Sequence, residues 1–147
     1  MTFELVVDLA VTAAKSQSIL VSRMTSGEVA ELETDIRERF TDGKLATPLW
    51  HGLVDEWSEF DEFGWRRVGD LAGEGTVSML ISDIGCNTGL VVESGMDLTT
   101  LLMELHGFVF YVVNAERTRL WAFNDHDFLI YCEAQLKDKE RVWGMSR

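Results

Sequence analysis

Proline, cysteine and long hydrophobic runs are all scarce in this chain. A single proline, Pro48, and two cysteines, Cys86 and Cys132, occur among 147 residues. The cysteines form no CxxC pair, the usual local sign of a zinc knuckle or a redox-active disulfide, so we assign neither of them a role. The longest uninterrupted apolar run, residues 108–113, is far too short to cross a bilayer.

Basic residues are also scarce. The chain has 13 lysines and arginines against 25 aspartates and glutamates, which gives a net charge of -12. A charge of this size repels nucleic-acid phosphates and anionic membrane surfaces, so we expect no nucleic-acid partner and no membrane partner. The same charge would speed the encounter with a basic protein, although it would also simply keep the chain in solution.

The bulk composition is that of a folded chain. Residues 1–8 lack the basic segment of a signal peptide and place acidic side chains within their apolar stretch, so we expect a cytoplasmic protein. Apolar residues make up 46% of the chain and aromatic residues 10%, and its length is typical of one domain. No repeat or linker divides it, so residues 1–147 are predicted to form a single globular domain.

Two helices are predicted in the N-terminal part. Thr25 and Glu28 have the spacing of a capping box, and apolar residues follow at helical spacing until residues 42–43, which predicts a helix over 26–41. Residues 3–21 also favour a helix, although their first apolar residues alternate as a strand would.

Residues 50–65 combine aromatic and acidic side chains. A helical stripe is formed by Leu53, Trp57, Phe60 and Phe63. The acidic residues fall mainly on the other side of such a helix, so the pattern predicts an amphipathic helix whose aromatic side chains enter the core.

The second half of the chain has the pattern of a sheet. Five segments are typical of strands: 77–81, 90–92, 108–113, 120–123 and 128–132. A glycine-rich turn at 85–89 joins the first two, and a short helix capped by Asp97 and ended by Gly107 precedes the third. This grouping predicts an α+β fold, with N-terminal helices packed on one face of a mainly antiparallel sheet formed by the C-terminal half.

The familiar catalytic motifs are missing from the sequence, including GxxxxGK[ST], HExxH and GxSxG. Gly73-Glu74-Gly75 begins like a dinucleotide-binding loop, but Ser78 stands where the third glycine would be, so a turn is predicted there instead. The sequence indicates no cofactor and no metal site. It leaves enzymatic activity open and favours a binding role.

Asp125, His126 and Asp127 are the best candidates for a chemical site, because two carboxylates could orient the imidazole between them. Adjacent residues seldom bind one ion together, however, and the same residues suit a tight turn. His51 and His106 could join His126 only if the fold brought them together.

The acidic segment gives the leading functional hypothesis, in which carboxylates and aromatic anchors bind a basic protein. The predicted contact residues are Asp55, Glu56, Trp57, Glu59, Phe60, Asp61 and Glu62. An immunity protein or inhibitor that neutralises a basic, nuclease-type toxin would fit this description.

Two alternatives stay open. In one, a small enzyme or ligand-binding domain has its pocket near residues 125–127. In the other, the basic tail from Lys137 onward meets the acidic segment of a second copy and forms a homodimer.

Overall fold

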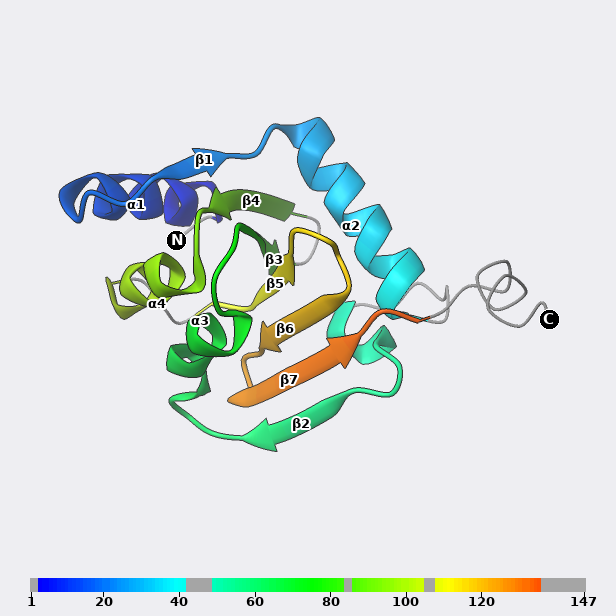
Figure 1. The fold of residues 1–147 in the computed structure, drawn as a ribbon. Coiled ribbons are helices and arrows are strands. Elements are labelled where there is room, and N and C mark those ends of the chain that lie inside the picture. Colours follow the sequence, from blue (N-terminus) through cyan, green and yellow to red (C-terminus); the bar gives the residue numbers. More distant parts are fainter. Residues whose placement is uncertain (1–2, 42–48, 84–85, 105–107, 136–147) are drawn as a thin grey trace.

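The computed structural model describes residues 3–41, 49–83, 86–104 and 108–135. Their helices are α1 (Phe3–Ser16), α2 (Ser26–Phe40), α3 (Arg67–Ala72) and α4 (Gly95–Glu104), with short 3-10 helices η1 (Leu49–Gly52) and η2 (Gly64–Arg66). Their strands are β1 (Val21–Arg23), β2 (Trp57–Phe60), β3 (Val77–Asp83), β4 (Cys86–Val92), β5 (Phe110–Asn114), β6 (Arg119–Phe123) and β7 (Phe128–Glu133). The chain therefore has the predicted α+β fold (Figure 1).

All seven strands join one antiparallel sheet in the order β1-β4-β3-β5-β6-β7-β2. The five inner strands come from the C-terminal half, as the sequence predicts. The two edge strands come from the first half, and neither of them was predicted. β2 pairs with β7, so that Trp57 lies opposite Tyr131 and Phe60 lies opposite Phe128.

Helices cover both faces of the sheet, which corrects the prediction that they pack on one face (Figure 1). Alternate residues of β5 enter different cores: Phe110 and Val112 pack with residues of α1, α3 and α4, whereas Tyr111 and Val113 pack with residues of α2. The apolar run in this strand is continuous because both of its faces are buried.

Helix α2 begins with the predicted capping box. The Glu28 N–H donates to Thr25 Oγ1 at 3.1 Å, and the Thr25 N–H donates to Glu28 Oε1 at 2.8 Å. The four apolar residues of its stripe, Val29, Leu32, Ile36 and Phe40, are all buried in the core on this side of the sheet.

The other helix ends differ in detail from the predictions. α1 ends at Ser16, short of the predicted end at residue 21, and Val21 begins β1. Asp97 does not cap α4 but lies in its first turn, where its N–H donates to Ser94 Oγ at 3.2 Å. Gly107 lies outside the described residues.

The helix predicted over residues 50–65 is wrong. This stretch forms η1, then the edge strand β2, then η2. Of the stripe that suggested a helix, Leu53 is buried, but the three aromatic residues that follow it in the stripe are exposed. An edge strand whose residues are exposed on both faces does not need strict alternation, so its sequence carried no period of two to compete with the helical one.

Helices α3 and α4 approach each other closely through two glycines. A Cβ atom added to Gly69 would collide with the backbone oxygen of Gly95 and with Thr99. A Cβ atom added to Gly95 would collide in turn with the backbone oxygen of Gly69. The contact therefore exists only because both residues lack a side chain.

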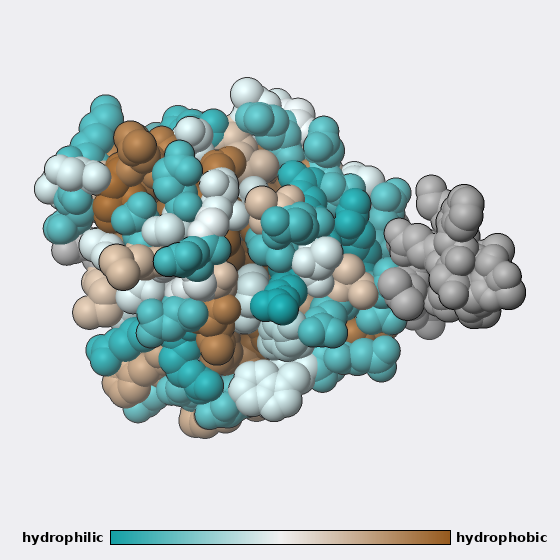
Figure 2. Space-filling model, viewed as in Figure 1, coloured by the Kyte–Doolittle hydropathy of each residue, from teal (hydrophilic) through white to brown (hydrophobic). Residues whose placement is uncertain are grey.

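Hydrophilic residues cover most of the face shown in Figure 2, and hydrophobic residues gather mainly at the end where α1 lies. In the described part of the chain, no helix has the length and apolar character needed to cross a membrane.

Candidate functional site

Strand β2 exposes its residues on both faces of the sheet edge. Trp57, Phe60 and the nearby Phe63 have 48%, 64% and 50% of their surface exposed. The register with β7 places Trp57 on the α1 side of the sheet, whereas Phe60 lies on the α2 side, where its ring contacts Phe128 at 5.7 Å between centroids. These aromatic side chains are therefore on the surface and not in the core.

Two of the five predicted acidic residues are already paired within the chain. Arg67 Nη1 lies 3.2 Å from Asp61 Oδ2 and 3.1 Å from Glu59 Oε2. These two hydrogen bonds, that of Asp61 first, raise the pKa of the Arg67 guanidinium. Asp55, Glu56 and Glu62 are exposed and form no ion pair with any residue that the structure describes.

The fold brings the acidic segment beside the Asp125-His126-Asp127 loop. The Asp61 N–H donates to the backbone oxygen of Asp127 at 2.9 Å. Two regions that the sequence offered as separate candidates are thus direct neighbours at one end of the sheet.

The loop between β6 and β7 is a tight turn, as its composition suggested. Asn124 Oδ1 accepts hydrogen bonds from the N–H groups of His126 and Phe128, both at 3.0 Å, and Asp127 has a φ of 64°. The side chains of Asp125 and His126 are more than half exposed, and their nearest polar atoms are 3.8 Å apart. Across the described ranges, no group of three or more potential ligand side chains could hold a metal ion.

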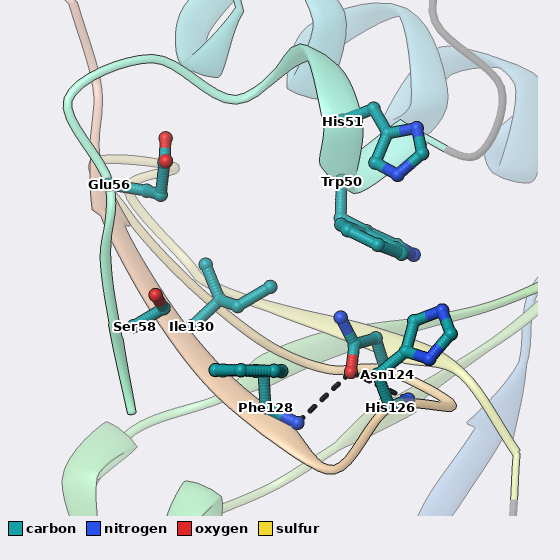
Figure 3. A pocket seen from close by; sticks show the side chains of 8 residues that line it. All are labelled: Trp50, His51, Glu56, Ser58, Asn124, His126, Phe128 and Ile130. Carbon is teal, nitrogen blue, oxygen red and sulfur yellow. Dashed lines mark hydrogen bonds between the residues drawn. The ribbon is translucent and has the colours of Figure 1, made fainter. Parts of the chain in front are cut away.

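A cavity of about 360 Å³ lies between η1, β2, β7 and this turn (Figure 3). It is lined by Trp50, His51, Glu56, Ser58, Asn124, His126, Phe128 and Ile130. Of the candidate residues from the sequence, Glu56, His51 and His126 line this cavity, whereas Asp125 and Asp127 do not. His106 lies outside the described residues.

Trp50 forms one wall of the cavity between two imidazole rings. Its ring centroid lies 4.0 Å from that of His51 and 5.9 Å from that of His126, both edge-on. Its backbone N–H donates to the hydroxyl of Tyr111 at 3.1 Å, which ties η1 to the central strand β5. Its indole Nε1 is buried and has no hydrogen-bond partner among the described residues.

Four cavity residues were not predicted: Trp50, Ser58, Asn124 and Phe128. Asn124 had a usable signal, because Asn114 stands at the same place in the preceding hairpin turn and its Oδ1 also accepts two backbone hydrogen bonds, from Thr118 and Arg119. The other three had no local signal, since they meet only when β2 pairs with β7.

The described cysteine has no features of a nucleophile. Cys132 is buried, and burial raises the pKa of its thiol to about 11. Its Sγ donates to the backbone oxygen of Val54 at 3.2 Å.

No protein-family model, no curated protein and no solved structure matches this chain.

Proposed function

We propose that this chain is a binding protein for a basic protein partner. The contact surface, here called the β2 surface, consists of Asp55, Glu56, Trp57, Glu59, Phe60, Asp61 and Glu62. The observation that carries the proposal is the exposure of Trp57 and Phe60 within this acidic segment.

The exposed aromatic side chains supply the affinity. A buried tryptophan or phenylalanine removes roughly 150–250 Å² from water, and a few such anchors dominate the binding energy of most interfaces. Trp57 and Phe60 are on the surface of the monomer, so much of this burial is still to be gained. Single exposed apolar residues are ordinary, but two large rings on one four-residue strand form an anchor pair.

The carboxylates supply the preference for a basic partner. Asp55, Glu56 and Glu62 are not paired with any cation of the described chain, so they are available to lysines and arginines of a partner. Glu59 and Asp61 are held by Arg67 and mainly fix the shape of the loop. The complex should therefore form faster and more tightly at low salt.

The strand edge gives the partner a further way to bind. β2 is the last strand of the sheet, and no described strand pairs with its outer edge. A segment of the partner could add to this edge as a further strand through backbone hydrogen bonds. Trp57 would then contact the partner on one face of the sheet and Phe60 on the other.

In its more specific form, the proposal is a cytoplasmic immunity protein or inhibitor of a nuclease-type toxin. A nuclease surface that binds phosphates would bind the carboxylates of the β2 surface instead, which would block access of nucleic acid.

The test is affinity purification from the native host with two baits, the unaltered protein and the Trp57→Ser/Phe60→Ser variant. Met96→Ser is the matched control, because Met96 is 78% exposed on α4, away from the β2 surface. We expect one basic protein to be retained in stoichiometric amount by the unaltered protein and by Met96→Ser, and to be lost from the double variant. The purified pair should also separate as salt is raised.

Retention of the same protein by the double variant, or an acidic partner whose binding ignores salt, would contradict the proposal. Sedimentation of the purified protein at low and high salt tests the homodimer hypothesis separately. The basic tail on which that hypothesis depends lies outside the described residues.

A further inference from the structure

Asn124 is a buried polar side chain whose amide oxygen is hydrogen-bonded and whose amide nitrogen is not. It is only 3% exposed, and both bonds that its Oδ1 accepts come from backbone N–H groups of the turn. Those donors fix the orientation of the amide, because a flipped amide would place its NH₂ group against two N–H groups. Nδ2 donates to no described residue, and it points into the cavity (Figure 3).

The cavity presents a different chemistry on its other side. Glu56 and Ser58 lie across it from Asn124 and His126 (Figure 3). Ring faces and edges from Trp50 and Phe128, with the side chain of Ile130, form the walls between these two polar ends. An occupant would therefore meet a hydrogen-bond donor at one end, a carboxylate acceptor at the other and apolar rings between them.

We propose that this cavity binds a flat, neutral small molecule that carries an amide carbonyl at one end of its ring and an N–H donor at the other. The carbonyl oxygen of the ligand accepts a hydrogen bond from Asn124 Nδ2, its ring packs against Trp50, and an N–H group at the far side of the ring faces Glu56 and Ser58. The volume of about 360 Å³ lies within the range of small-molecule sites. This site does not depend on the proposed protein partner.

The polar groups decide against charged ligands. A guanidinium or ammonium group has no acceptor for Asn124 Nδ2, so a cation that covers this donor would leave it unpaired. A carboxylate or phosphate would satisfy Asn124 but would be repelled by Glu56 and by the net charge of -12. Only a neutral ligand with an acceptor at one end and a donor at the other suits both ends of the cavity.

Three probes of nearly the same shape test this assignment: benzamide, benzamidinium and benzoate. Their binding to the full chain is measured by saturation-transfer NMR and by titration calorimetry. We expect benzamide to bind with a dissociation constant on the order of millimolar, as suits so small a ligand, and to bind more tightly than both charged probes.

Asn124→Asp keeps the oxygen that organises the turn and replaces the NH₂ donor by an acceptor. We expect this variant to bind benzamide about fivefold or more weakly and to prefer benzamidinium. Asn114→Asp is the control, since it makes the same substitution in the preceding hairpin turn, away from the cavity. It also removes the hydrogen bonds that Asn114 Nδ2 donates to Glu116 and Thr118, and it should leave benzamide binding unaltered. If Asn124→Asp does not fold, Glu56→Gln replaces it, and benzoate should then gain relative to benzamide.

Three results would overturn the assignment: no benzamide binding at about 10 mM, tighter binding of benzamidinium than of benzamide by the unaltered protein, or equal benzamide binding by Asn124→Asp. Trp57→Ser separates the two proposals. Trp57 lies on the other face of β2, so its loss should abolish partner binding and leave benzamide binding intact.

Discussion

Replacing Gly69 by alanine should destabilise the protein, although alanine is the better helix former. In the interior of a helix the substitution is worth about 1 kcal/mol in favour of alanine. Here the added methyl group would collide with the backbone oxygen of Gly95 and with the backbone and side chain of Thr99. Backbone atoms in a packed helix pair cannot move aside independently, so α3 and α4 would have to separate.

The two effects can be compared in magnitude. Overpacking a buried contact costs about 1–3 kcal/mol, and this contact lies at the upper end because backbone opposes the methyl group. After subtraction of the helix-propensity gain, we expect Gly69→Ala to lower the free energy of unfolding by about 2 kcal/mol. Neighbouring core residues, Val68 and Leu98, would lose packing as the helices part.

Urea unfolding followed by circular dichroism measures this difference. Gly27→Ala is the matched control, because a Cβ atom there would touch only Thr25 Oγ1, at an ordinary 3.9 Å. We expect the control to be as stable as the unaltered protein or up to about 1 kcal/mol more stable. A Gly69→Ala protein with an unchanged or higher urea midpoint would refute the steric argument.

Two further predictions concern titrating groups on the α2 side of the sheet. In a Cys86→Ser background, Cys132 should react with a thiol reagent at pH 8 only after unfolding, because its thiol is buried and burial raises its pKa to about 11. Rapid reaction of the folded protein would contradict this. Burial also raises the pKa of Tyr111, so the unfolded chain loses its phenolic proton first and stability should fall as the pH rises above 10.0. Urea midpoints at increasing pH should show a shallower decline for Tyr111→Phe than for the unaltered protein, and equal declines would exclude this tyrosine as the cause.

Local signals in the sequence were sufficient where a segment is stabilised by its own neighbours. Helix α2 could be predicted because its cap, from Thr25 to Glu28, and its apolar stripe all lie within one short stretch. The hairpin turns could be predicted for the same reason, since each begins with an asparagine whose side chain bonds the turn's own backbone. Both features depend on residues that are close together in the sequence.

The sequence failed where distant pairing decides the structure. Trp57 and Phe60 have helical spacing, and only the register with β7 makes their segment a strand. The cavity could not be predicted for the same reason. Trp50 and Asn124 line one cavity only because β2 pairs with β7, and the local sequence pattern did not reveal β2. The acidic residues of the β2 surface lie outside the core, as the sequence predicted. Their place on a strand edge was not predicted.

The position of β2 at the end of the sheet has a consequence for its dynamics. The strand is four residues long and pairs with β7 on one side only. The two paired segments are far apart in sequence. Such an element opens more easily than the inner strands, so its backbone amides should exchange with deuterium well before those of β3 and β5. A partner that requires β2 in place would slow this exchange, and local folding of the strand would then become part of the binding equilibrium.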